Sequence, residues 1–287
     1  MANLKELRNR ITSISSTMQI TSAMKMVSAA KLKKAQDAIE QMRPFSSKLQ
    51  DIIANVSATL DSSEGPFSQE REVKNLLIVP VTSNRGLCGG FNSGVIKSVN
   101  SVIDENKGAK VSLFTIGKKS VAAYKRTDMV SGEDIEIWND LTFANASDIA
   151  EQLMTEYLEG KWDKIVLVYN RFKNAATQVV TAEQFLPISS SEESTTDSAS
   201  TGDYIYEPKK EEILDILIPK SLKTQVFKVL LDSQASEHGA RMTAMHKATD
   251  NATDLRDGLK LEYNQARQAA ITNEILEIVG GAEALAG

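Results

Sequence analysis

Cysteine, histidine and long apolar runs are scarce in this chain. Cys88 is the single cysteine, and His238 and His246 are the two histidines among 287 residues. One cysteine excludes an intrachain disulfide and fits a reducing compartment. No apolar run approaches the ~20 residues that a membrane-spanning helix needs, and the polar opening residues predict no signal peptide. Any work at a membrane is therefore expected to be peripheral.

Motifs for catalysis are also missing. The glycine-rich loop 86–94 follows an expected strand and precedes an expected helix, a place where phosphates often bind. It lacks the lysine and hydroxyl of G-x-x-x-x-G-K-[ST] and the spacing of G-x-G-x-x-G. We therefore interpret its glycines as permitting close approach to a neighbouring backbone, with a nucleotide site as the less favoured alternative.

The reactive side chains are too far apart to form a site. Cys88 lies about 150 residues from either histidine, which disfavours a Cys–His nucleophile. The histidines are roughly 12 Å apart along a helix, too far to share a metal without other ligands. The sequence therefore predicts no catalytic residue, no cofactor and no metal site.

A long C-terminal helix is the dominant feature, predicted from Pro219 to Leu285 and roughly 100 Å long. Pro219 suits the first helical position because it has no N–H and a fixed φ. Small and apolar residues first recur every 3.5 residues, at Leu222, Val226, Val229, Ser233, Ser236, Ala240 and Thr243. They then recur about every 3.7 residues, at Ala244, Ala248, Ala252, Leu255, Leu259, Tyr263, Ala266 and Ala270. So thin a stripe requires a partner helix.

That partner is predicted at the N-terminus, in a helix reaching about Leu60 with a bend at Pro44. Its apolar face has a period of 3.5, at Leu4, Leu7, Ile11, Ile14, Met18 and Thr21, extended by Met24 and Val27. The first 50 residues are basic, although the whole chain has a net charge of −5 and does not suggest nucleic-acid binding. We predict that the two helices form an antiparallel coiled coil.

Between the helices, apolar runs alternate with helical patterns. Strands are expected at 76–81, 111–116, 164–169 and 177–185, and helices at 93–105, 120–126 and 148–158. This alternation predicts a Rossmann-like α/β domain with a mostly parallel sheet and an edge strand at its end. The expected division is 1–60 (coiled-coil helix), 74–188 (α/β domain), 189–212 (polar loop) and 213–287 (coiled-coil helix), with 213–218 as a short element before Pro219.

The end of the C-terminal helix is apolar on more than one face. Its apolar residues are Ile275, Leu276, Ile278, Val279, Ala282, Leu285 and Ala286. If this helix is longer than its partner, the tip is exposed and requires an apolar sleeve from another protein. The alternative is that the tip folds back or frays.

Four segments carry distinctive motifs. They begin at Ile20, Ser83, Ser236 and Tyr263 and read ITSAMKMV, SNRGLCGGFN, SEHGARMTAMHKATDN and YNQARQAAITNEI. In order and over the whole chain they resemble the γ subunit of F-type rotary ATP synthases. The single cysteine and the lack of an inserted cysteine pair resemble the bacterial and mitochondrial forms rather than the chloroplast form.

The resemblance implies a central rotor stalk that carries torque and has no active site. Its implied partners are one hexamer of α and β subunits per γ chain, an ε subunit and a membrane c-ring. It further implies ATP synthesis coupled to ion transport at the cytoplasmic face of a bacterial inner membrane. No nucleic-acid binding and no direct membrane insertion are implied.

The resemblance also implies β-subunit contacts at matching positions. These are Arg267, Gln268 and Thr272 near the tip, Glu237 and Arg241 further down the helix, and Met24 and Lys25 on the first helix. The tip residues Ile275, Leu276, Ile278, Val279 and Leu285 would turn in an apolar bearing.

Two other functions fit the residues less well. One is a small enzyme with a Rossmann-like domain, which nucleotide binding by the isolated chain would favour. The other is a coiled-coil adaptor or peripheral membrane scaffold, which liposome binding by the basic first helix would favour.

Overall fold

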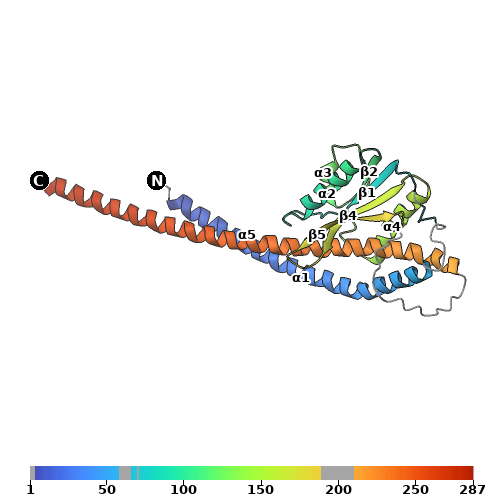
Figure 1. The fold of residues 1–287 in the computed structure, drawn as a ribbon. Helices are drawn as coiled ribbons and strands as arrows, with labels where there is room; N and C mark the ends of the chain where they lie inside the picture. The colour runs from blue at the N-terminus through green and yellow to red at the C-terminus, as the bar shows by residue number, and fades with distance from the viewer. Residues whose placement is uncertain (1–3, 58–65, 70, 189–209, 287) are drawn as a thin grey trace. The chain divides into compact units, whose positions relative to one another are not determined.

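The computed structural model describes residues 4–57, 66–69, 71–188 and 210–286 (Figure 1). Contacts divide the chain into two compact units: residues 1–28 with 241–287, here the coil unit, and residues 29–240, here the sheet unit. Helices α1 (Leu4–Ser57) and α5 (Lys210–Ala286) contribute to both. The predicted four-part division stays a prediction, and most of its polar loop lies outside the described residues.

The sheet unit contains a five-stranded sheet with the order β3-β2-β1-β4-β5. Its strands are β1 (Asn75–Pro80), β2 (Lys110–Ile116), β3 (Val130–Asp134), β4 (Lys164–Phe172) and β5 (Gln178–Leu186). All neighbours are parallel except β4 and β5, which form an antiparallel hairpin. The mostly parallel α/β sheet with an edge strand at its end, predicted from the sequence, is confirmed.

Helices cover both faces of the sheet (Figure 1). One face packs against α2 (Phe91–Glu105) and α3 (Lys118–Tyr124), through buried residues such as Val95 and Tyr124. The other packs against α4 (Phe143–Leu158) and the part of α5 that contains Leu222 and Val226. Central strands enclosed on two faces must be apolar throughout, which explains the continuous apolar runs of β1 and β4.

The start of α5 differs from the prediction. The helix begins at Lys210 and continues through Pro219, which had been expected to be its first residue. A proline inside a helix costs about 3 kcal/mol because it removes a hydrogen bond and crowds the preceding turn. Ile218 and Leu222, on either side of Pro219, pack into the core of the sheet unit. Full burial of a leucine such as Leu222 contributes about 1.5–3 kcal/mol, and the half-buried Ile218 adds to it, so the two offset much of the cost of the proline.

In the coil unit, α1 and α5 run antiparallel, as predicted. Arg8 contacts Tyr263, Met18 contacts Thr253, Thr21 contacts Thr249 and Lys25 contacts His246. Positions on α5 therefore decrease as positions on α1 increase. The hydroxyl oxygens of Thr21 and Thr249 are 2.8 Å apart, so small polar side chains form part of the helix–helix contact.

The contact face of α5 keeps the period of 3.5 from Met245 to Ala266. Its buried and half-buried centre is formed by Met245, Thr249, Ala252, Arg256, Leu259, Tyr263 and Ala266, here called the seam. The predicted change to 3.7 was wrong at Leu255, which is 56% exposed while Arg256 lies on the contact face. Two polar residues, Thr249 and Arg256, belong to the seam although the predicted stripe did not include them. Thr253 and Arg256 donate to the sulfur of Met18, which explains how polar side chains are accommodated there.

Two glycines of α5 provide a matched test of packing. A Cβ built on Gly258 meets nothing within 4 Å, whereas one built on Gly239 lies 3.0 Å from the Ala175 carbonyl oxygen in the β4–β5 turn. We expect Gly258→Ala to stabilise the chain by about 0.5–1 kcal/mol through helix propensity. Gly239→Ala should lose that gain to crowding. Thermal unfolding followed by far-UV circular dichroism measures both, and equal gains would contradict the close contact.

Candidate functional site

The described residues show little sign of catalytic chemistry. Cys88 is 2% exposed, and its sulfur lies 3.1 Å from the Asn92 amide nitrogen, so it is a buried loop residue. No group of three or more His, Cys, Asp or Glu side chains in the described part of the chain is placed to hold a metal ion. Nor does any helix among those residues combine the length and apolarity needed to cross a bilayer.

The glycine-rich loop is shaped by backbone conformation. Gly89 has φ of 58° with nothing within 4 Å of a built Cβ, and Leu87 has φ of 63°. The predicted close approach to a neighbouring backbone was wrong, because a Cβ built on Gly94 meets a side chain instead, Val180 Cγ2 at 3.0 Å. Left-handed conformation is the reason for Gly89. Asn92 holds the loop by accepting from the Ser83 backbone N–H at 3.0 Å. No lysine and hydroxyl pair of a phosphate loop is present in it.

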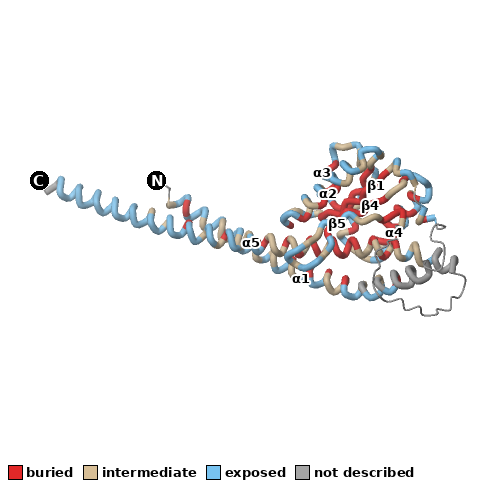
Figure 2. Tube along the Cα trace, in the orientation of Figure 1, coloured by how far each residue is buried: buried red, intermediate tan, exposed pale blue. Residues whose placement is uncertain are grey.

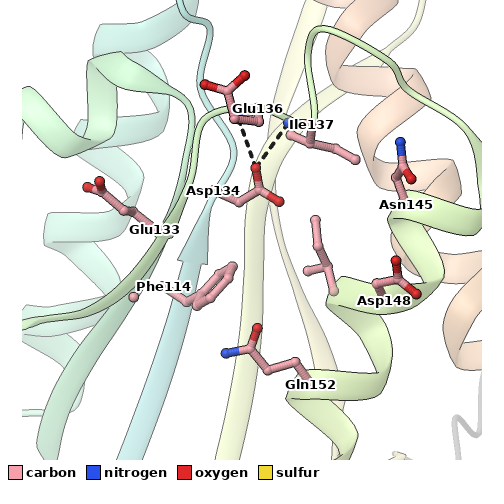
Figure 3. A pocket seen from close by; sticks show the side chains of 10 residues that line it. Phe114, Glu133, Asp134, Glu136, Ile137, Asn145, Asp148 and Gln152 are labelled. Atoms are coloured by element: carbon pink, nitrogen blue, oxygen red, sulfur yellow. Dashed lines mark hydrogen bonds between the residues drawn. The ribbon is translucent and has the colours of Figure 1, made fainter.

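A pocket of about 450 Å³ opens beside β3 and α4 (Figure 3). Its lining is Phe114, Gly132, Glu133, Asp134, Glu136, Ile137, Asn145, Asp148, Ile149 and Gln152. The Asp134 carboxylate accepts from the backbone N–H groups of Glu136 and Ile137, so it closes its own turn. The lining offers negative charge but neither a histidine nor a hydroxyl or thiol nucleophile. Acyl transfer through such a nucleophile is therefore not indicated.

The distal end of α5 is an uncovered surface of the coil unit. Every position from Arg267 to Ala284 is exposed (Figure 2). Of the predicted contact residues, Arg267, Gln268 and Thr272 lie here, with Gln268 and Thr272 one turn apart. The predicted bearing residues Ile275, Leu276, Ile278 and Val279 are 54%, 63%, 67% and 49% exposed. Leu285 is also in α5, but its side chain lies outside the described part.

The apolar face of this end is not a continuation of the seam. Ile271, Ile275, Ile278 and Ala282 recur every 3.5 residues and form one stripe, here called the tip stripe. At about 100° per residue, the tip stripe is rotated by roughly 100° around the helix from the seam. Glu277 and Gly281 occupy the seam direction instead. A longer α1 would therefore not cover the tip stripe, which requires a different partner.

The remaining predicted contacts are divided between the units. Glu237, in the sheet unit, and Arg241, in the coil unit, are 9% and 7% exposed. Little of either side chain is available to a partner in this conformation, and their role stays a prediction. Met24 and Lys25 are half-buried, and Lys25 Nζ lies 3.4 Å from His246 Nδ1. Asp250 lies 3.4 Å from the same ring nitrogen.

Sequence reasoning missed an apolar surface on α1. Val27, expected on the packed face, is 57% exposed, and Ser28 is buried in its place. Ile20, seven residues earlier and therefore on the same side of the helix, is 60% exposed. The signal was present in the sequence: Ile20 and Val27 are seven residues apart, and each directly precedes a residue of the pair Thr21 and Ser28, which faces α5. These residues place an apolar surface beside Met24.

Comparisons with known proteins agree on one family. A family model described as ATP synthase matches residues 3–285. The ATP synthase gamma chains of Flavobacterium johnsoniae and Flavobacterium psychrophilum are 62% and 61% identical to this chain, covering 100% of it and of themselves.

Solved structures give the same fold. The central stalk and c-ring structure of the Tetrahymena thermophila mitochondrial ATP synthase contains a chain with 28% identity and a TM-score of 0.60. It covers 80% of this chain and 99% of its own length. A chain of the Euglena gracilis mitochondrial ATP synthase has 22% identity and a TM-score of 0.68, with 98% and 94% covered. This chain therefore belongs to the ATP synthase gamma chain family.

Proposed function

We propose that this chain is the central rotor stalk of a rotary ATP synthase, without an active site of its own. It carries torque between an ion-driven ring in the membrane and a catalytic hexamer of α and β subunits. The exposed end of α5 supports this most directly. Eighteen consecutive exposed positions carry a tip stripe that α1 cannot cover, which fits a helix end turning inside an apolar sleeve.

The polar residues below the tip stripe fit intermittent contacts. Arg267 offers a fork of N–H donors to a carboxylate, and Gln268 both donates and accepts. Both are exposed, so neither has to break a buried contact before binding a β subunit. On α1, the apolar surface of Ile20 and Val27 beside Lys25 fits a partner loop with apolar and acidic residues. Such contacts form and break as the stalk turns.

Asymmetry then supplies the mechanism. A single stalk inside a three-fold ring presents a different side to each β subunit. Each subunit is therefore biased towards a different nucleotide state, because a ligand shifts a conformational equilibrium by its difference in affinity. ATP is made or hydrolysed on the β subunits. The complex acts at the cytoplasmic face of a bacterial inner membrane, with ε and the c-ring bound to the same stalk.

Reconstitution tests the proposal. Purified α and β subunits from a related source are mixed with this chain at one copy per hexamer, and steady-state ATP hydrolysis is measured. We expect the chain to co-purify with the hexamer and to raise sustained turnover. A chain that neither co-purifies nor changes turnover would contradict the rotor assignment. Liposome binding by the free chain would then favour the adaptor alternative.

A further inference from the structure

The β4–β5 hairpin holds α5 by polar contacts at two places and by close packing at a third, all within the sheet unit. Gln225 Nε2 donates to Glu183 Oε1 at 2.7 Å, and Ser236 Oγ donates to the Asn170 carbonyl oxygen at 3.0 Å. Gly239 then allows the turn residue Ala175 to approach the helix. These α5 positions are eleven and three residues apart, so they share one side of the helix over roughly 20 Å.

Glu183 connects the helix to the sheet through both of its oxygens. Oε1 accepts from Gln225, whereas Oε2 accepts from the Tyr169 hydroxyl at 2.7 Å. Tyr169 is 1% exposed. Burial, followed by the neighbouring Glu183 charge, raises the pKa of Tyr169, so its phenol keeps its proton and remains a donor. One carboxylate thus holds one donor from β4 and one from α5.

These hydrogen bonds fix the rotation of α5 about its own axis, which apolar packing of the same helix does not. Val226, Val229 and Leu230 of α5 are buried in the core of the sheet unit. Apolar contact is non-directional, so it holds a helix against a sheet without selecting one rotation about the helix axis. Hydrogen bonds weaken steeply when their distance or angle changes. A rotation by one residue, about 100°, would remove Gln225 from Glu183 and Ser236 from Asn170.

We propose that Glu183 and Gln225 form a joint that fixes the rotation of α5 against the β4–β5 hairpin, and that torque passes between sheet and stalk helix through this joint. The inference rests on the proposed function as a rotor stalk. Both residues are positioning residues, since they touch no nucleotide. Ser236 and Gly239 support the same joint from the other end of the hairpin.

An exchange of the two side chains tests the joint. Gln225→Glu places two carboxylates opposite each other, while Glu183→Gln leaves an amide that still pairs with Gln225. The double variant E183Q/Q225E restores a donor opposite a carboxylate. Each full-length chain is assembled with the remaining synthase subunits in sealed vesicles. ATP synthesis driven by an ion gradient and ATP hydrolysis are then measured on the same preparation.

We expect Gln225→Glu to lower the ratio of synthesis to hydrolysis about 2- to 10-fold, a range typical of coupled neighbouring side chains. The double variant should recover most of that loss. Gln234→Glu is the matched control. It makes the same chemical change on α5, and Gln234 has no hydrogen bond to the hairpin in the described structure. It should leave the ratio unchanged.

Four outcomes decide the question. An unchanged ratio in Gln225→Glu, or a loss that the double variant does not recover, would overturn the joint. If Gln225→Glu fails to assemble, Gln225→Ala replaces it, and an unchanged ratio there overturns the joint as well. Failure of the unmodified chain to support any synthesis would instead count against the proposed function, so the two failures are distinguishable.

Discussion

Alanine at position 117 is expected to unfold the sheet unit or prevent its assembly. Gly117 has φ of 92°, and a Cβ built there lies 2.1 Å from the Thr82 carbonyl oxygen. Thr82 is fully buried and cannot move away easily, because its N–H donates to the Ile116 carbonyl oxygen at 2.9 Å. The ends of β1 and β2 would have to separate. We expect a loss of about 4 kcal/mol or more in the free energy of unfolding.

Gly108→Ala is the control for this variant. Gly108 lies just before β2, in the same unit, and a Cβ built there meets nothing within 4 Å. Urea unfolding followed by circular dichroism should show it close to the unmodified chain. Similar midpoints for Gly117→Ala and Gly108→Ala would show that the sheet end tolerates a side chain at position 117.

The double variant Arg267→Ala, Gln268→Ala is expected to lower coupled turnover about tenfold without loss of fold. Both residues are exposed on α5, and alanine is the strongest helix former, so the helix itself should be unaffected. Hydrogen bonds to charged groups contribute about 1.5–3 kcal/mol each, so loss of one such contact already gives a tenfold effect. ATP synthesis and hydrolysis by the reconstituted complex measure it.

A matched pair on the same helix distinguishes a local contact from general damage. Lys260→Ala with Gln265→Ala also removes one cation and one amide from exposed positions of α5. That variant should keep most of the turnover. Undiminished ATP synthesis in the Arg267 and Gln268 variant would remove these residues from the proposed β contact, whatever the control does.

The sheet was largely predictable, because central strands have a strong local signal. β1 and β4 are continuous apolar runs, and their neighbours follow from the alternation with helices. Strand β3 was missed, since Val130–Asp134 contains a single large apolar residue and lies at the sheet edge. An edge strand with one paired side needs little apolar surface. Its position depends on β2, and that is not encoded locally.

In the helices, tertiary packing overrides local sequence preferences at two places. Pro219 obeys the rule for a helix start, yet tertiary burial on both sides carries the helix through it. Leu255 is apolar and was assigned to the seam, whereas Arg256 occupies that face and Leu255 is exposed. The 3.5-residue period of two helices in contact determines which residues of α5 face α1, and a polar residue is accommodated where that period requires it.

Some features of the candidate site were also predictable from the sequence, and others were not. The exposed apolar tip was visible in the sequence because it is local to one helix. The contact of Gln225 with Glu183 joins residues 42 apart in the chain. Neither residue carries a motif, so only the packing of α5 on the hairpin brings them together. The rotation of the tip stripe away from the seam required the burial of individual residues to define both faces.

The angle between the tip stripe and the seam depends on the number of residues between them. Deleting one residue between Ala266 and Ile271 would turn everything beyond it back by about 100°. The four residues of the tip stripe would then follow Ala266 at steps of 4, 4, 3 and 4, close to the direction of the seam. An α1 extended by a few turns at its N-terminus could then cover the tip stripe in the way that α1 covers the seam. In the chain as it stands, the offset between the two stripes keeps the apolar tip outside the α1–α5 contact, whatever the length of α1.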